Sequence, residues 1–207
     1  MRSRLFSAMA MASAMLGPAP AAADYESANA AYARYDFVAA YAELRPLAEQ
    51  GDARAQSQLG TMYYLGQAVA QDYAEAARWY RAAADQGYHR GQSNLASLYL
   101  AGIGVRQDYA EALRLSRAAA SQGNADAMAN LGYMHFNGLG VPQSDAEALR
   151  WYRAAAEAGG AVAQYNLAYM YQTGRGVPPD VTEARRWYQA AASQGDADAE
   201  AALQQLR

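Results

Sequence analysis

The sequence predicts an all-α fold, an α-solenoid of stacked helix-turn-helix repeats. The first observation is a strict internal period, since Leu59, Leu95, Leu131 and Leu167 recur every 36 residues. The second is composition, because Ala and Tyr are abundant while Val/Ile-rich runs of the kind that favour strands are scarce. A unit of this size buries its apolar stripe only against its neighbours, so the units are expected to stack in one dimension.

Each unit is predicted to contain two helices. The 36-residue step divides the chain, without insertion or deletion, into residues 53–88, 89–124, 125–160 and 161–196. Within each half of a unit, apolar residues recur at helical spacing. The loops "GQAV", "GIGV", "GLGV" and "GRGV" separate the halves, and glycine there tolerates the left-handed conformation that ends a helix.

Acidic residues at the start of each second helix are predicted to cap it. Four pairs have the spacing of a capping box: Asp72 with Glu75, Asp108 with Glu111, Ser144 with Glu147, and Asp180 with Glu183. The third unit carries Ser144, which caps about as well as Asp but offers no carboxylate for acid–base chemistry. A structural role survives this exchange, and a repeated catalytic site does not.

The tryptophans of the second helices are predicted to pack in the core. One position of the repeat holds Trp79, Trp151 and Trp187. The alternative to core packing is that these rings form a platform on which a ligand stacks. Leu115 fills the fourth copy of that position, as a core position allows and a stacking site does not.

Residues 1–23 have the features of a signal peptide. Arg2 and Arg4 precede the apolar run "LFSAMAMASAML", and Ala21 to Ala23 fit a cleavage site after Ala23. The alternative is an Ala-rich tail that is not processed. Cleavage predicts a periplasmic or secreted protein without membrane insertion, and removal of Arg2 and Arg4 leaves 15 basic and 20 acidic residues, a net charge near −5. An acidic chain without a basic patch is not expected to bind nucleic acid.

Composition also excludes several chemistries. The chain has no Lys and no Cys, which rules out Schiff-base, phosphate-loop lysine and thiolate mechanisms. His89 and His135, the only histidines, fall in different repeats and do not predict a metal site. No catalytic residue, metal or cofactor is therefore predicted.

The repeat pattern resembles a known family. The stretch "ARAQSQLGTMYYLGQAVAQDYAEAARWYRAAADQG" is similar to the Sel-one-like repeat (SLR), a relative of the tetratricopeptide repeat, and the resemblance covers residues 53–196 as four units. Residues 24–52 resemble a shorter tetratricopeptide-like hairpin that caps the array, with Pro46 expected to kink or split its second helix. Residues 197–207 resemble a C-terminal capping helix.

The resemblance implies that the α-solenoid is right-handed, and it implies a function as well as a fold. It implies a monomeric, non-catalytic adaptor for a protein or peptide partner in an envelope, signalling or secretion complex. Some relatives are known as penicillin-binding or β-lactamase proteins, so a hydrolase acting on cell walls or β-lactams is the alternative. That alternative is weakened here, because those relatives are rich in Cys and this chain lacks both Cys and a Ser-x-x-Lys pair.

If the first helix of each unit lines the concave side, as in related repeats, its variable positions face a groove. The predicted partner-binding residues are Ser57, Thr61, Tyr64, Ser93, Asn94, Ser97, Asn130, Tyr133, Phe136, Tyr165, Asn166 and Tyr169. Tyrosine is favoured at interfaces. The three asparagines recur at one position of the repeat and could hold a peptide backbone, but this regularity indicates that they serve the fold at least as much as a partner. The alternative is that these positions vary because they are unconstrained surface.

Overall fold

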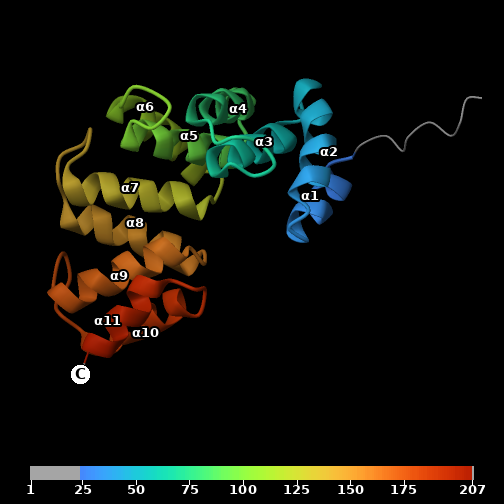
Figure 1. Cartoon of the computed structure of the whole chain (residues 1–207). Coiled ribbons are helices and arrows are strands. Elements are labelled where there is room, and N and C mark those ends of the chain that lie inside the picture. Colours follow the sequence, from blue (N-terminus) through green and yellow to red (C-terminus); the bar gives the residue numbers. More distant parts are fainter. Residues whose placement is uncertain (1–23, 207) are drawn as a thin grey trace, which may run out of the picture.

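A computed structural model describes residues 24–206, which form eleven α-helices and, over that range, no strand (Figure 1). The helices are α1 (Tyr25–Ala33), α2 (Phe37–Glu49), α3 (Ala53–Leu65), α4 (Tyr73–Asp85), α5 (His89–Ala101), α6 (Tyr109–Ala120), α7 (Ala125–Asn137), α8 (Asp145–Glu157), α9 (Ala161–Thr173), α10 (Val181–Ala192) and α11 (Ala197–Gln205). The predicted signal peptide, residues 1–23, lies outside the described residues. The all-α repeat fold is confirmed.

Each 36-residue unit is a hairpin of two packed helices: α3/α4, α5/α6, α7/α8 and α9/α10. The hairpins follow one another from the green to the red end of the chain (Figure 1). The first helices of neighbouring repeats contact each other, while each second helix packs mainly against the first helices on either side of it. The first helices therefore form the tighter, inner layer of the stack.

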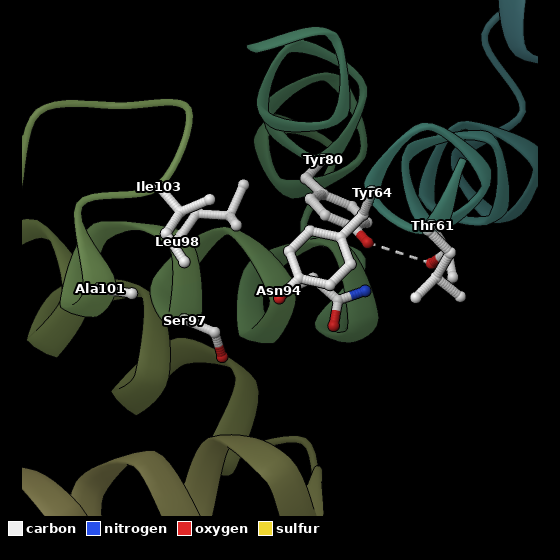
Figure 2. A pocket seen from close by; sticks show the side chains of 9 residues that line it. Thr61, Tyr64, Tyr80, Asn94, Ser97, Leu98, Ala101 and Ile103 are labelled. Carbon is white, nitrogen blue, oxygen red and sulfur yellow. Dashed lines mark hydrogen bonds between the residues drawn. The ribbon is translucent and has the colours of Figure 1, made fainter. Parts of the chain in front are cut away.

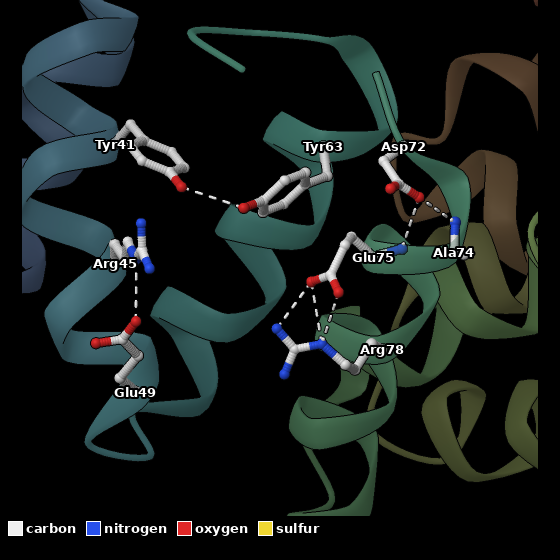
Figure 3. A network of polar contacts seen from close by, with 8 residues as sticks. All are labelled: Tyr41, Arg45, Glu49, Tyr63, Asp72, Ala74, Glu75 and Arg78. Carbon is white, nitrogen blue, oxygen red and sulfur yellow. Dashed lines mark hydrogen bonds and ion pairs between the residues drawn. The ribbon is translucent and has the colours of Figure 1, made fainter. Parts of the chain in front are cut away.

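The predicted N-caps are confirmed, but the reciprocal half of the capping box is not formed. Oδ1 of Asp72 accepts hydrogen bonds from the backbone N–H groups of Ala74 and Glu75 (Figure 3). Glu75 instead pairs with Arg78, at 2.8 Å. The backbone N–H of Asp72 is already used, because it donates to the carbonyl of Tyr63 in the first helix of the same hairpin. This bond recurs in all four repeats, so the cap residue also joins the two helices.

The consecutive Trp and Tyr of the second helix differ in how deeply they are buried. Tyr80, Tyr152 and Tyr188 are buried, whereas among the tryptophans only Trp79 is, at 8% exposure. Trp151 and Trp187 are partly buried, and the guanidinium of the preceding Arg covers each ring, at 4.3 Å for Arg150 over Trp151. The prediction of core packing thus holds fully for Trp79 and in part for the other two.

The N-terminal hairpin corrects one part of a prediction. Pro46 was expected to kink or split the second helix of residues 24–52, and the split does not occur, because α2 continues as one helix from Phe37 to Glu49. Leu44 and Ala48 are buried on either side of the proline, and α2 packs against both α1 and α3. We attribute the continuity to this packing, which compensates for the hydrogen bond that proline removes.

Glutamine pairs that sequence reasoning overlooked join the two helices of one hairpin to each other and to the end of the preceding hairpin. Nε2 of Gln122, just after α6, donates to Oε1 of Gln92 and to the carbonyl of Gly87, both at 3.0 Å. The same arrangement recurs one repeat earlier from Gln86 and two repeats later from Gln194. The acceptor Gln92 is 7% exposed, so a buried polar group finds its partner here.

Candidate functional site

A hollow opens on the inner layer where the first and second repeats meet. It measures about 450 Å³ and is called the groove pocket below. Its lining residues are Thr61, Tyr64, Leu65, Tyr80, Asn94, Ser97, Leu98, Ala101 and Ile103. Figure 2 shows how side chains from α3, α4, α5 and the loop after α5 surround it. This volume suits a small ligand or one or two side chains of a peptide.

A hydrogen-bonded series of groups holds one wall of the groove pocket. The Tyr80 hydroxyl donates to Oγ1 of Thr61 at 3.1 Å (Figure 2), and Thr61 donates onward to the carbonyl of Ser57 at 3.2 Å. Burial raises the pKa of Tyr80 to about 12, so the phenol stays neutral and remains a donor at physiological pH. The wall is therefore uncharged and fixed in orientation.

The groove pocket continues into a second hollow of about 270 Å³ at the junction of the second and third repeats. This second hollow is lined by Ser97, Leu100, Ala101, Asn130 and Tyr133. Ser97 and Ala101 line both hollows, so the two form one concave surface along α3, α5 and α7. No charged side chain lines either hollow. Six of the twelve predicted residues lie here: Thr61, Tyr64, Asn94, Ser97, Asn130 and Tyr133.

Two of the predicted residues are not accessible to a partner. Ser57 is 4% exposed and Ser93 is 1% exposed. The reason is that first helices of neighbouring repeats touch: Nδ2 of Asn130 in α7 lies 3.4 Å from the carbonyl of Ser93 in α5. For Ser57 and Ser93, the prediction that they face the groove is therefore wrong.

Phe136 and Tyr169, two of the four remaining predicted residues, meet at the junction of the third and fourth repeats. Phe136 is packed edge-to-face with Tyr152 and Tyr169, and the guanidinium of Arg175 lies 3.6 Å from its ring centre. Arg175 also forms a two-pronged ion pair with Asp145. Phe136 is thus engaged within the protein, whereas Tyr169 keeps 38% of its surface exposed.

Tyr165 and Asn166, the last of the predicted set, also make internal contacts. Tyr165 packs edge-to-face on the ring of Tyr188, and Nδ2 of Asn166 donates to the carbonyl of Val162 in its own helix.

The three asparagines do not form a uniform series. Asn130 donates to Oγ of Ser97 at 3.0 Å, which joins α7 to α5, whereas Asn166 bonds within α9. Asn94 has no side-chain hydrogen bond to any described residue and lies in the groove pocket (Figure 2). An amide offers two donors and an acceptor, so Asn94 is available to bind a peptide group.

Several residues of the groove pocket were missed by sequence reasoning. Ile103 belongs to a loop and Tyr80 to a second helix, so neither was among the first-helix positions considered. A signal for Ile103 exists, since its counterparts 36 residues apart are Gln67, Leu139 and Arg175. This loop position varies as strongly as the groove positions do.

The described residues suggest no metal centre and no membrane span. Within residues 24–206 no group of three or more His, Cys, Asp or Glu side chains gathers. His89 is engaged with Asn124, at 3.0 Å between Nδ1 and Nδ2, and His135 is partly buried in a slot that other repeats fill with Tyr. No helix of that range is long and apolar enough to cross a bilayer.

The stacked hairpins and the concave inner surface define a helical-solenoid repeat protein. Known proteins refine this class, because the family model described as Sel1 repeat matches residues 53–88, 89–124, 125–160 and 161–196. These are the ranges into which the 36-residue step divides the chain. The chain belongs to the Sel1 repeat family, whose members are generally non-catalytic scaffolds for protein–protein interaction.

Solved structures agree with this assignment. A Sel1 repeat protein from Oxalobacter formigenes is 34% identical with a TM-score of 0.73, over 87% of this chain and 74% of that one. A protective antigen with an SLR fold from uropathogenic Escherichia coli is 39% identical with a TM-score of 0.65, over 80% of this chain but only 36% of that one. A Sel1 repeat protein from Klebsiella pneumoniae, at 22% identity and a TM-score of 0.62 over 88% and 90% of the two chains, shares the fold. Comparison with curated proteins gave no significant match.

Proposed function

We propose that this protein is an exported, non-catalytic scaffold whose inner surface binds an uncharged peptide segment of a partner protein. The observation that carries the proposal is the continuous concave surface formed by the groove pocket and the second hollow, lined by no charged side chain. A charged residue of a peptide would lose hydration there without gaining a partner. An apolar side chain of the peptide would instead rest against Leu65, Leu98 and Ile103, while Asn94 pairs with its backbone.

Repeat-to-repeat variation supports the same region. Ser97 stands at the centre of the surface, and its counterparts one and two repeats later are Tyr133 and Tyr169. Small side chains thus keep the first two junctions open, while a tyrosine stands at the edge of the second hollow with 49% of its surface exposed. Because the third and fourth repeats carry Tyr at this position, the fold does not require a small residue there. The small side chain of Ser97 therefore keeps the groove pocket open.

Selection of phage-displayed random peptides on the purified protein tests the binding mode. We expect the selected peptides to share uncharged segments with one aliphatic or aromatic anchor. Ser97→Tyr, which copies the next repeat, should weaken their binding by about tenfold or more because it fills the groove pocket. Paired substitution of Tyr133→Ala and Tyr169→Ala should also abolish capture while leaving the circular-dichroism melt nearly unchanged.

A matched control lies on the outer layer, where Gln189 of α10 is exposed. Gln189→Tyr adds the same side chain away from the inner surface and should leave peptide binding intact. Enrichment of charged peptides, or equal binding by Ser97→Tyr, would reject the proposal. Turnover of cell-wall fragments or a β-lactam by the purified protein would favour the alternative hydrolase.

Export is the second part of the proposal and has its own test. It is supported by the basic start and apolar run of residues 1–23. Expression of the full chain in a Gram-negative host should place the protein in the periplasm or the medium, with Asp24 as its first residue by N-terminal sequencing. An unprocessed chain in the cytosol would contradict export without affecting the peptide-binding experiment.

A further inference from the structure

A third hollow lies away from the groove, between the second helix of the first repeat and the loop of the second. It measures about 670 Å³ and is called the arginine hollow below. Its lining residues are Arg81, Tyr99, Val105, Arg106, Gln107, Asp108 and Tyr109. None of these residues lines the groove pocket or the second hollow, so the site is separate from the proposed peptide groove.

The two arginines of the arginine hollow are not neutralised by ion pairs. Arg78 and Arg114 each pair with a Glu three residues earlier, but neither Arg81 nor Arg106 forms a salt bridge with a described residue. Nη2 of Arg81 donates to the Tyr99 hydroxyl at 2.7 Å, which orients the guanidinium and leaves its other N–H groups available.

One acidic side chain shares this space. Oδ1 of Asp108 accepts hydrogen bonds from the backbone N–H groups of Ala110 and Glu111, both at 3.0 Å, so the carboxylate is held at the start of α6. Two guanidinium groups and one carboxylate leave the lining with a formal charge of +1. This balance suits a singly charged anion and disfavours a dianion, which Asp108 would repel.

The other repeats show which of these residues the fold does not need. The pair Arg81–Tyr99 recurs as Arg153–Tyr171, with a hydrogen bond of 2.8 Å. The counterparts of Arg106 are Ala70, Pro142 and Pro178. Among the four repeats, only the second therefore carries an arginine at the position of Arg106, although every repeat has the same loop.

We propose that the arginine hollow binds a carboxylate on a polar organic body, such as the C-terminal carboxylate of a short peptide. Planar guanidinium groups bind the two oxygens of a carboxylate in a fixed geometry. The volume leaves room for more than a bare ion and lies in the range of small-ligand sites. The hydroxyl groups of Tyr99 and Tyr109 supply further hydrogen bonds around the body of the ligand.

The probe is N-acetyl-trialanine with a free C-terminal carboxylate, compared with the same peptide as its C-terminal amide and with inorganic phosphate. Titrations are followed by NMR through the Nε–H signals of the arginines. The peptide with the free carboxylate should shift the signals of Arg81 and Arg106. The peptide amide should bind with an affinity at least about tenfold lower. The affinity should also fall as salt is added. Equal binding of the amide, or binding of phosphate in place of the carboxylate, would overturn the proposal.

Variants copied from the protein's own repeats keep the fold. Arg106→Ala reproduces the first repeat, where Val69 to Asp72 read V-A-Q-D, and Arg81→Gln reproduces Gln189 of α10. Each should weaken carboxylate binding by about tenfold, with an unchanged melting temperature. Arg153→Gln, at the matching pair between the third and fourth repeats, should have no effect. Wild-type affinity in Arg106→Ala, or an equal loss in Arg153→Gln, would show that the hollow is not the site.

Discussion

The carbonyl oxygen of Tyr73, at the start of α4, occupies the space into which a side chain on Gly104 would project. Gly104 belongs to the loop of the second repeat, so this loop lies directly on the second helix of the first repeat. The contact recurs at the next two junctions, where a Cβ on Gly140 would lie 2.9 Å from Cβ of Tyr109 and one on Gly176 would lie 2.6 Å from the carbonyl of Asp145. The second loop glycine is therefore a packing point between repeats.

Substitution of Gly104→Ala should destabilise the protein by about 2 kcal/mol or more. Its φ of +69° is costly for a residue with a Cβ, and the added atom collides with backbone that has little freedom to move. The control is Ala68→Gly, since Ala68 already adopts a φ of +60° at the matching position of the first repeat. That change should alter stability by less than about 1 kcal/mol. Urea unfolding measures both, and equal effects would refute the packing role of Gly104.

The tryptophan positions should differ in their contribution to stability. Trp79→Ala should cost more than Trp151→Ala, for which we expect on the order of 3 kcal/mol, because Trp79 is buried and Trp151 is partly exposed beneath Arg150. Trp151→Leu copies Leu115 of the second repeat and should retain most of the stability. Thermal unfolding measures the order of the stability losses. A melting temperature of Trp151→Ala equal to that of the wild type would show that Trp151 is not part of the core.

Alkaline pH should unfold the protein through its buried tyrosines. Burial raises the pKa of both Tyr80 and Tyr188 to about 12, above the value of about 10 in an unfolded chain. Because the folded pKa is raised, this contribution to stability is complete below pH ~10 and is lost as the pH rises through ~12. Phenolate absorbance and circular dichroism should therefore change together in that interval. Full phenolate formation with an intact helical spectrum would contradict the burial of these hydroxyls.

The sequence predicted the repeat architecture well because stacking repeats impose the same contacts in every unit. Leu59, the caps at Asp72 and Ser144, and the loop glycines each have one structural solution, and it is repeated four times. Comparison between units then separates what the fold requires from what it tolerates.

The candidate groove was predicted only in part. Periodicity places Ser57 and Ser93 on the same helix face as Thr61 and Ser97, but it does not reveal that the N-terminal halves of neighbouring first helices touch. The distance between helices depends on contacts in three dimensions, which the helical period does not specify. For the same reason Ile103, on a loop, was not predicted to line the groove pocket.

The glutamine pairs lead to the last prediction. Gln122 bonds to Gln92 and to the carbonyl of Gly87, yet the third repeat has Met128 and Ala158 at the matching positions, so both members of the pair are replaced together. Gln122→Ala should cost about 1–3 kcal/mol, because it leaves the buried amide oxygen of Gln92 without a partner.

The double variant Gln92→Met with Gln122→Ala copies the third repeat and should be more stable than Gln122→Ala alone. Replacing both hydrogen-bonding partners by apolar groups removes the buried amide altogether. Replacing Gln122 alone leaves the amide of Gln92 buried without a partner, which lowers the free energy of unfolding. A double-mutant cycle in urea gives the coupling between the two positions, which we expect to be about 0.5–3 kcal/mol. If the two substitutions are simply additive, the paired glutamines do not act as one contact between the two helices of the hairpin, and their joint absence from the third repeat has another cause.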